Sequence, residues 1–133
     1  DVRLAQSIAA TQPAVATALA RAGGAASPGM MQSLARQLDR ASERMRSLGL
    51  TVARVPLMPS ATPRAWLSYN NGIVEARGGR LIYYMPTFDA DPLDAAAAEL
   101  FRAAGCQVVP IDCSAVWPLG GSLHCLVNVI ERR

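Results

Sequence analysis

Apolar side chains between residues 27 and 48 return every three or four positions, with arginines and acidic residues between them. This spacing places one apolar stripe on a helix. Ser27 is a suitable N-cap, Pro28 suits the first helical position, and Gly49 is a common stop residue. The pattern therefore predicts one long helix from residue 28 to about residue 48.

Residues 1–22 are rich in alanine, with a weaker helical period that Pro13 interrupts. Proline is accepted in the first turn of a helix and not in its interior. We therefore expect two short helices here, the second ending at Gly23 and Gly24.

The second half of the chain alternates between extended and helical patterns. Runs rich in β-branched and aromatic residues are typical of strands, and Asp91-Pro92 before an apolar stripe is typical of a helix start. The strands are expected at 51–58, 66–76, 80–87 and 107–113, and the helix between Asp91 and Gly105. An alternation of this kind favours an α/β fold.

Residues 120–130 begin with two glycines and continue as an apolar, partly β-branched run. We interpret them as a tight turn that leads into a strand. In a strand, neighbouring side chains point to opposite faces, so His124 and Cys125 would point apart. His124 is the only histidine in the chain. Any imidazole that serves Cys125 would then come from outside this sequence.

Composition limits the class of protein. The chain has 133 residues, 51% of them hydrophobic and 17% charged, which excludes a disordered polypeptide. No apolar run approaches the ~20 residues that cross a bilayer, so no membrane partner is expected. The net charge of +3 comes from scattered arginines with no interleaved aromatic stripe, which argues against nucleic-acid binding.

The cysteines Cys106, Cys113 and Cys125 are odd in number and have no CxxC spacing. A zinc site would need four ligands, and only these three and His124 are available, at irregular spacings. We expect no metal and no cofactor. Unpatterned cysteines favour a reducing, cytoplasmic compartment, with secretion as the alternative and a disulfide between any two left open.

The run Gly-Gly-Ser-Leu-His-Cys at 120–125, followed by an apolar segment at the C-terminus, resembles the catalytic-cysteine motif of the guanidine-modifying enzymes, the pentein superfamily. Within it, the chain is most similar to agmatine deiminase and the bacterial peptidyl-arginine deiminases. The resemblance covers roughly residues 30 to 133. It implies a pseudo-five-fold α/β propeller of ββαβ modules, of which this chain supplies about two.

The resemblance also implies a division of the chain. Residues 1–26 would be a helical insert or linker, residues 27–65 the helix and strand of one module, and residues 66–133 the last module with the cysteine motif. Two modules cannot close a five-module ring and would leave sheet edges unpaired. We therefore expect a C-terminal fragment or one chain of a split protein, whose partner is the missing N-terminal portion. A homo-oligomer is a further arrangement that stays open.

By this resemblance Cys125 is the catalytic nucleophile, which attacks the central carbon of a guanidinium group. The candidate substrate-binding residues are Asn70, Asn71 and Gly121, although two asparagines within a strand pattern equally suit a bulge or turn. The family's catalytic histidine and carboxylates would lie upstream of Asp1. The isolated chain would then be inactive.

The implied function is hydrolysis of a guanidine C–N bond in agmatine or an arginine peptide through a covalent thiouronium intermediate. Leu126-Val127-Asn128 departs from the threonine that many deiminases carry soon after the cysteine, so the substrate subclass stays open. The alternative is a non-catalytic binding or structural module of an inactive relative. A redox or metal protein is a third interpretation, which no ligand spacing supports.

Overall fold

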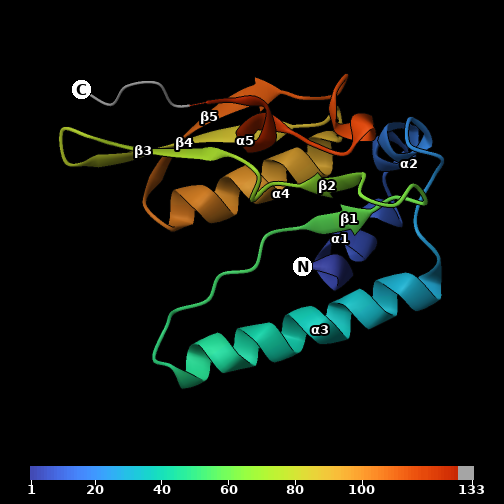
Figure 1. Cartoon of the computed structure of the whole chain (residues 1–133), viewed down its shortest axis with the longest axis horizontal. Helices are drawn as coiled ribbons and strands as arrows, with labels where there is room; N and C mark the ends of the chain where they lie inside the picture. The colour runs from blue at the N-terminus through green and yellow to red at the C-terminus, as the bar shows by residue number, and fades with distance from the viewer. Residues whose placement is uncertain (129–133) are drawn as a thin grey trace.

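The computed structural model describes residues 1–128 as a mixed α/β structure with two small sheets (Figure 1). The helices are α1 (Val2–Ala9), α2 (Pro13–Ala20), α3 (Pro28–Ser47), α4 (Asp91–Ala103), the short α5 (Leu123–Leu126) and the 3-10 turn η1 (Trp117–Leu119). The strands are β1 (Leu57–Pro59), β2 (Trp66–Ser68), β3 (Ile73–Arg77), β4 (Arg80–Thr87) and β5 (Cys106–Asp112). No helix in this part of the chain is long and apolar enough to cross a membrane.

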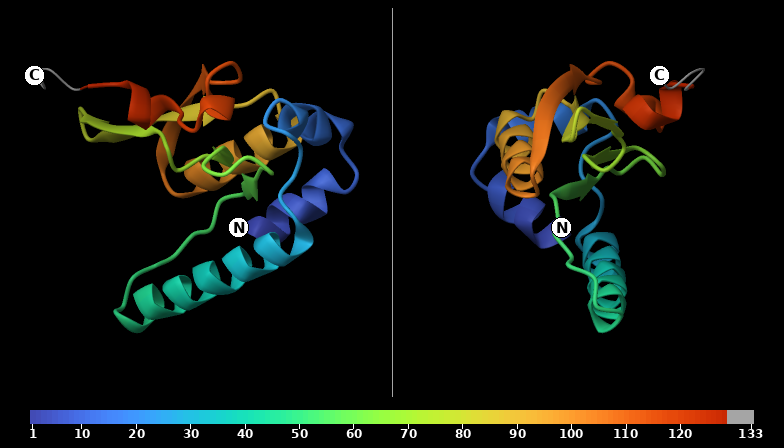
Figure 2. Two further views of the ribbon diagram at one scale, coloured as in Figure 1. Left: turned by 45° about the vertical axis from the view of Figure 1, so that its right-hand side comes forward. Right: turned by 90° about the vertical axis from the view of Figure 1, so that its left-hand side faces the viewer.

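The larger sheet has the strand order β3-β4-β5. β3 and β4 form an antiparallel hairpin, and β4 pairs in parallel with β5 after the crossover through α4. Gly78 and Gly79 both have positive φ, which two-residue hairpin turns of this kind require. Figure 2 shows α4 and α5 on opposite sides of this sheet. The run β3, β4, α4, β5 is one ββαβ unit, and β1 and β2 form a separate antiparallel pair.

The four longer helices are confirmed. The Ser27 hydroxyl accepts the Met30 amide hydrogen at 3.3 Å and caps α3, and Gly49 follows the helix with φ of 82°. The two N-terminal helices share the common core, since Val2 and Val15 are fully buried. The centre of the core near the sheet is aromatic, with Phe88 between Tyr69 and Trp117 in edge-to-face contacts.

Two of the predicted strands are shorter than expected. Residues 51–56 form no strand, and pairing begins only at Leu57, since a chain with Pro56 and Pro59 has few amide donors for a ladder. The predicted strand 66–76 is interrupted by a turn over Tyr69–Gly72, and its two ends lie in different sheets. The turn interpretation of the two asparagines is therefore confirmed.

The predicted strand at 120–130 is wrong over the residues that are described. Leu123–Leu126 form a helical turn, and Val127 and Asn128 belong to no element. The β-branched part of the run starts only at Val127. The His124 amide donates its hydrogen bond to the Asn71 carbonyl oxygen and not to the backbone of a neighbouring strand. The rest of that predicted strand lies outside the described residues. His124 and Cys125 still do not face each other, because adjacent positions on a helix project in different directions.

Candidate functional site

Cys125 is exposed, and its sulfur lies against the side-chain amide of Asn71. The Asn71 Nδ2 atom is 3.2 Å from Sγ, and the Asn71 Oδ1 atom is 3.3 Å from it. The amide N–H can donate to a thiolate, and the oxygen can accept from a thiol, so both states of the sulfur have a partner. A hydrogen-bond donor directed at a sulfur anion is a feature of nucleophilic cysteines.

The backbone of Asn71 holds the cysteine segment in place. Its carbonyl oxygen accepts the His124 amide hydrogen at 3.0 Å and the Ser122 hydroxyl at 3.4 Å. Ser122 is 2% exposed. The turn at 69–72 and the start of α5 are thus joined, although the two partners Asn71 and Cys125 are 54 positions apart in the sequence.

The backbone favours glycine on both sides of this junction, at Gly72 and at Gly120. A Cβ atom at Gly72 would lie 2.4 Å from the Tyr84 carbonyl oxygen and 2.6 Å from the Tyr83 ring. A Cβ atom at Gly121 would lie 3.4 Å from the Cys125 Cβ atom, an ordinary van der Waals distance. Gly120 has φ of 96°, a conformation that favours glycine.

A cavity of about 320 Å³ opens beside this junction. Three of the four predicted site residues, Asn70, Asn71 and Gly121, line it, and the fourth, Cys125, contacts Asn71. The other lining residues are Arg64, Trp66, Ser68, Gly120 and Ser122. No carboxylate is among these lining residues, and Arg64 is the charged one. The cavity therefore suits polar and anionic groups, and its described walls do not by themselves hold a guanidinium cation.

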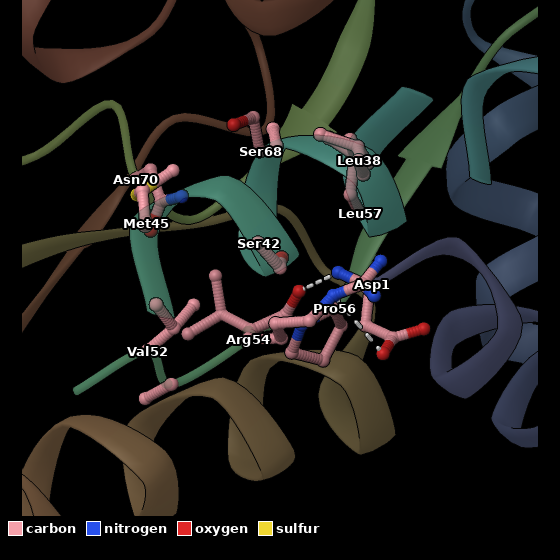
Figure 3. Close-up of a pocket in the computed structure, with 13 residues that line it drawn as sticks. Asp1, Leu38, Ser42, Met45, Val52, Arg54, Pro56, Leu57, Ser68 and Asn70 are labelled. Carbon is pink, nitrogen blue, oxygen red and sulfur yellow. Dashed lines mark hydrogen bonds and ion pairs between the residues drawn. The ribbon is translucent and has the colours of Figure 1, made fainter. Parts of the chain in front are cut away.

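A second, smaller cavity of about 160 Å³ lies between α3 and the segment that returns to β1 (Figure 3). Ser68 and Asn70 line this cavity as well as the first. Its arginine, Arg54, is paired with the carboxylates of Asp1 and Asp39. The charges of this cavity are thus neutralised within the fold, and we assign it no chemistry.

Asp39 also forms two hydrogen bonds to the Arg3 guanidinium, at 2.7 and 3.1 Å. The hydrogen bonds from Arg3 and then Arg54 hold the pKa of Asp39 well below its usual range. This carboxylate stays ionised and links α1 to α3.

The remaining reactive side chains are not brought together. His124 contributes its backbone amide to the junction, and no hydrogen bond joins its imidazole to Cys125 in the described structure. Cys106, Cys113 and Cys125 are all free thiols, and burial raises the pKa of Cys113. Residues 1–128 contain no group of three or more histidine, cysteine or acidic side chains arranged to hold a metal ion.

Sequence reasoning missed Ser122, Arg64 and Trp66 as parts of the site. Ser122 lies within the cysteine motif at 120–125, and this position could have identified it as a candidate site residue. Arg64 and Trp66 carried no such signal, because only the folded chain brings Arg64 beside Gly120 and Trp66, the first residue of β2, to the same cavity.

A sequence model of the Porphyromonas-type peptidyl-arginine deiminases matches residues 9–129, which is most of the chain and includes the whole junction between Asn71 and Cys125. No curated protein and no solved structure matches the chain.

Proposed function

The chain belongs to the Porphyromonas-type peptidyl-arginine deiminase family, and on this premise we propose that it carries the nucleophilic cysteine of a deiminase that converts peptidyl-arginine to peptidyl-citrulline. The observation that carries the proposal is the exposed Cys125 sulfur held against the Asn71 amide, beside an open cavity. The family description names peptidyl-arginine, which favours an arginine peptide over agmatine as the substrate.

The proposed reaction begins when the Cys125 thiolate attacks the central carbon of the guanidinium group. A C–S bond forms, the C=N electrons move to nitrogen, and a tetrahedral species results. One C–N bond then breaks and ammonia leaves with the proton it needs, which gives a thiouronium. Water adds to the same carbon, the C–S bond breaks, and a ureido group and the thiolate are released. In the overall reaction a guanidinium ion and water give a substituted urea and an ammonium ion.

Asn71 stabilises the attacking state of the sulfur in this proposal. Its Nδ2–H group donates to the anionic sulfur, and its carbonyl fixes the backbone before Cys125. Asn70 and Gly121 form walls of the same cavity and are proposed to contact the substrate there. The absence of a side chain at Gly121 leaves room beside the sulfur.

The proton carrier and the carboxylates that grip the guanidinium are proposed to come from another stretch of polypeptide. Two observations support this. His124, the only histidine in the sequence, lies in the same helical turn as Cys125, and no hydrogen bond joins its imidazole to the sulfur in the described structure. The charged residue that lines the cavity is Arg64. In this proposal the ββαβ unit is one module of a propeller, completed by an N-terminal portion that supplies these groups.

The test compares three preparations on an arginine peptide and on agmatine, with release of ammonia and formation of the ureido group as readouts. These are the 133-residue chain alone, the chain together with the polypeptide encoded before it, and the same pair with Cys125→Ser. We expect no turnover by the chain alone. We expect the pair to turn over the arginine peptide, and the pair with Cys125→Ser to be inactive. A Cys106→Ser variant of the pair is the matched control and should stay active.

Each other outcome has a definite meaning. Turnover by the chain alone would show that the proton carrier and the guanidinium-binding carboxylates do not come from another polypeptide. Full activity of the Cys125→Ser pair would remove Cys125 from the chemistry. A folded pair that binds an arginine peptide without turning it over would instead establish the alternative, a non-catalytic binding module.

A further inference from the structure

The half-buried carboxylate of Asp94 lies within hydrogen-bond distance of the turn that presents Asn71 to Cys125. Its Oδ1 atom accepts the Tyr69 hydroxyl at 2.7 Å and the Phe88 amide at 3.2 Å, and its Oδ2 atom accepts the Ala90 amide at 3.2 Å. Asp94 thereby binds both the backbone that leads into α4 and the first residue of the turn. Burial raises the pKa of Asp94, and these hydrogen bonds oppose the shift.

Tyr69 is held at both ends. Its ring is fully buried against Phe88, with ring centroids 5.2 Å apart, and its carbonyl oxygen accepts the hydroxyl of Tyr83. Tyr83 is packed in turn on Phe101 of α4, at 4.1 Å between ring centroids. Tyr69 is thus a fixed point of the sheet and helix rather than part of a loose loop.

Only Asn70 separates this fixed point from Asn71. Gly72 on the other side is wedged against the Tyr84 carbonyl oxygen, so the turn is fixed at both ends and presents Asn71 outward. The contact that results, 3.2 Å from Nδ2 to Sγ, tolerates little displacement, because hydrogen bonds weaken steeply with distance and angle.

We propose that Asp94 and Tyr69 are positioning residues for Cys125, acting through the turn and the Asn71 side chain. Neither touches the sulfur or the substrate cavity. Their hydrogen bond fixes the start of the turn, the turn fixes Asn71, and the Asn71 side chain holds the sulfur in place. The effect of Asp94 and Tyr69 on catalysis rests on the proposed function. Their effect on the position of the Cys125 sulfur does not depend on that function.

The test measures the rate at which iodoacetamide alkylates Cys125 in the 133-residue chain, by mass spectrometry of the Cys125 peptide, with Cys106 as an internal reference. Tyr69→Phe removes the hydroxyl and keeps the buried ring. We expect alkylation of Cys125 to slow by about three- to tenfold, the equivalent of one hydrogen bond of ordinary strength. Alkylation of Cys106 should be unchanged.

Two further variants separate positioning from general loosening. Tyr84→Phe is the matched control, because it removes a tyrosine–carboxylate hydrogen bond of the same 2.7 Å length, to Glu75, that does not lead to Asn71. It should leave the rate at Cys125 unchanged. In an Asn71→Ala background, Tyr69→Phe should have no additional effect, because the contact through which it acts is already gone.

The proposal is overturned if folded Tyr69→Phe reacts at the wild-type rate, if Tyr84→Phe slows Cys125 equally, or if Tyr69→Phe slows the Asn71→Ala chain further. Asp94→Ala, which removes both acceptor oxygens, takes the place of Tyr69→Phe, with the same expectations, if circular dichroism shows that Tyr69→Phe is unfolded. Iodoacetamide needs neither a histidine nor a guanidine substrate. A slowed Cys125 in a chain that proves not to be a deiminase would therefore refute the proposed function and keep this inference.

Discussion

Gly72→Ala is the substitution to which the junction between the turn and α5 should be most sensitive. The added Cβ atom would lie 2.4 Å from the Tyr84 carbonyl oxygen and 2.6 Å from the Tyr83 hydroxyl and ring carbon. Both neighbours belong to the central strand β4, which is paired on both sides and cannot move aside. The turn itself must therefore shift, by about 1 Å to reach ordinary contact distances.

The magnitude follows from two terms. Overpacking of this kind costs about 1–3 kcal/mol in the free energy of unfolding. The shift also separates the Tyr83 hydroxyl from the Tyr69 carbonyl, and a buried polar group left without a partner costs about 1–3 kcal/mol. We expect a total loss of about 2–6 kcal/mol, a large share of the roughly 5–15 kcal/mol that a domain possesses.

The assay is urea denaturation followed by circular dichroism, with Gly29→Ala as the matched control. No atom lies within 4 Å of a Cβ at Gly29, which is in the first turn of α3, so the same chemical change should be neutral or stabilising by about 0.5 kcal/mol. If the free energy of unfolding of Gly72→Ala lies within about 0.5 kcal/mol of the wild-type value, the reasoning is refuted, because the turn would then not approach β4 so closely.

Three further predictions concern the thiols, the half-buried carboxylate of Asp94 and a helix cap. In the folded chain Cys125 should react with iodoacetamide first, and Cys113 only on unfolding, since it is buried and its pKa is raised; rapid labelling of Cys113 would contradict this. The pKa of the Asp94 carboxyl, measured by NMR titration, should lie above the ordinary value of about 3.9, so that ionisation of Asp94 lowers the free energy of unfolding as pH rises through that pKa. Tyr69→Phe should raise this pKa further, because it removes a hydrogen bond to the carboxylate. A pKa of Asp94 below the ordinary value would contradict this. Ser27→Ala should lower the free energy of unfolding by about 1 kcal/mol by removing the cap of α3, and an unchanged urea midpoint would show that the cap contributes nothing.

The four longer helices, α1 to α4, could be predicted from the sequence because their signals are local. The apolar period, the cap at Ser27, the stop at Gly49 and the proline near the start of α4 all lie within the elements they define. The hairpin at Gly78-Gly79 is local in the same sense. No tertiary contact was needed to place any of these.

The segments that were predicted incorrectly depend on partners far away in the sequence. Residues 66–76 have the composition of one strand, but the ring of Tyr69 is drawn into the core and the chain turns there to enter a second sheet. Residues 123–126 have no neighbouring strand to pair with in the described structure, and the Asn71 carbonyl instead stabilises a helical turn. A strand requires a partner, and a sequence pattern does not show whether one is present.

The candidate site divides in the same way. Cys125 and Asn71 were both candidates from the family resemblance, Cys125 through its motif and Asn71 through the pair of asparagines at 70 and 71. Their contact was not predictable, because it joins segments 54 positions apart. The hydrogen bond from Tyr69 to Asp94 was equally hidden, since neither residue has a local pattern that marks it.

The central claim is that the sulfur of Cys125 forms a covalent bond to the guanidine carbon of a substrate. The most direct measurement is acid quenching of the chain and its upstream polypeptide during turnover of an arginine peptide, followed by mass spectrometry of the digested protein. We predict an adduct on the Cys125 peptide whose mass is that of the substrate less ammonia. Turnover with no such adduct on Cys125, or with the adduct on Cys106 or Cys113, would contradict the claim.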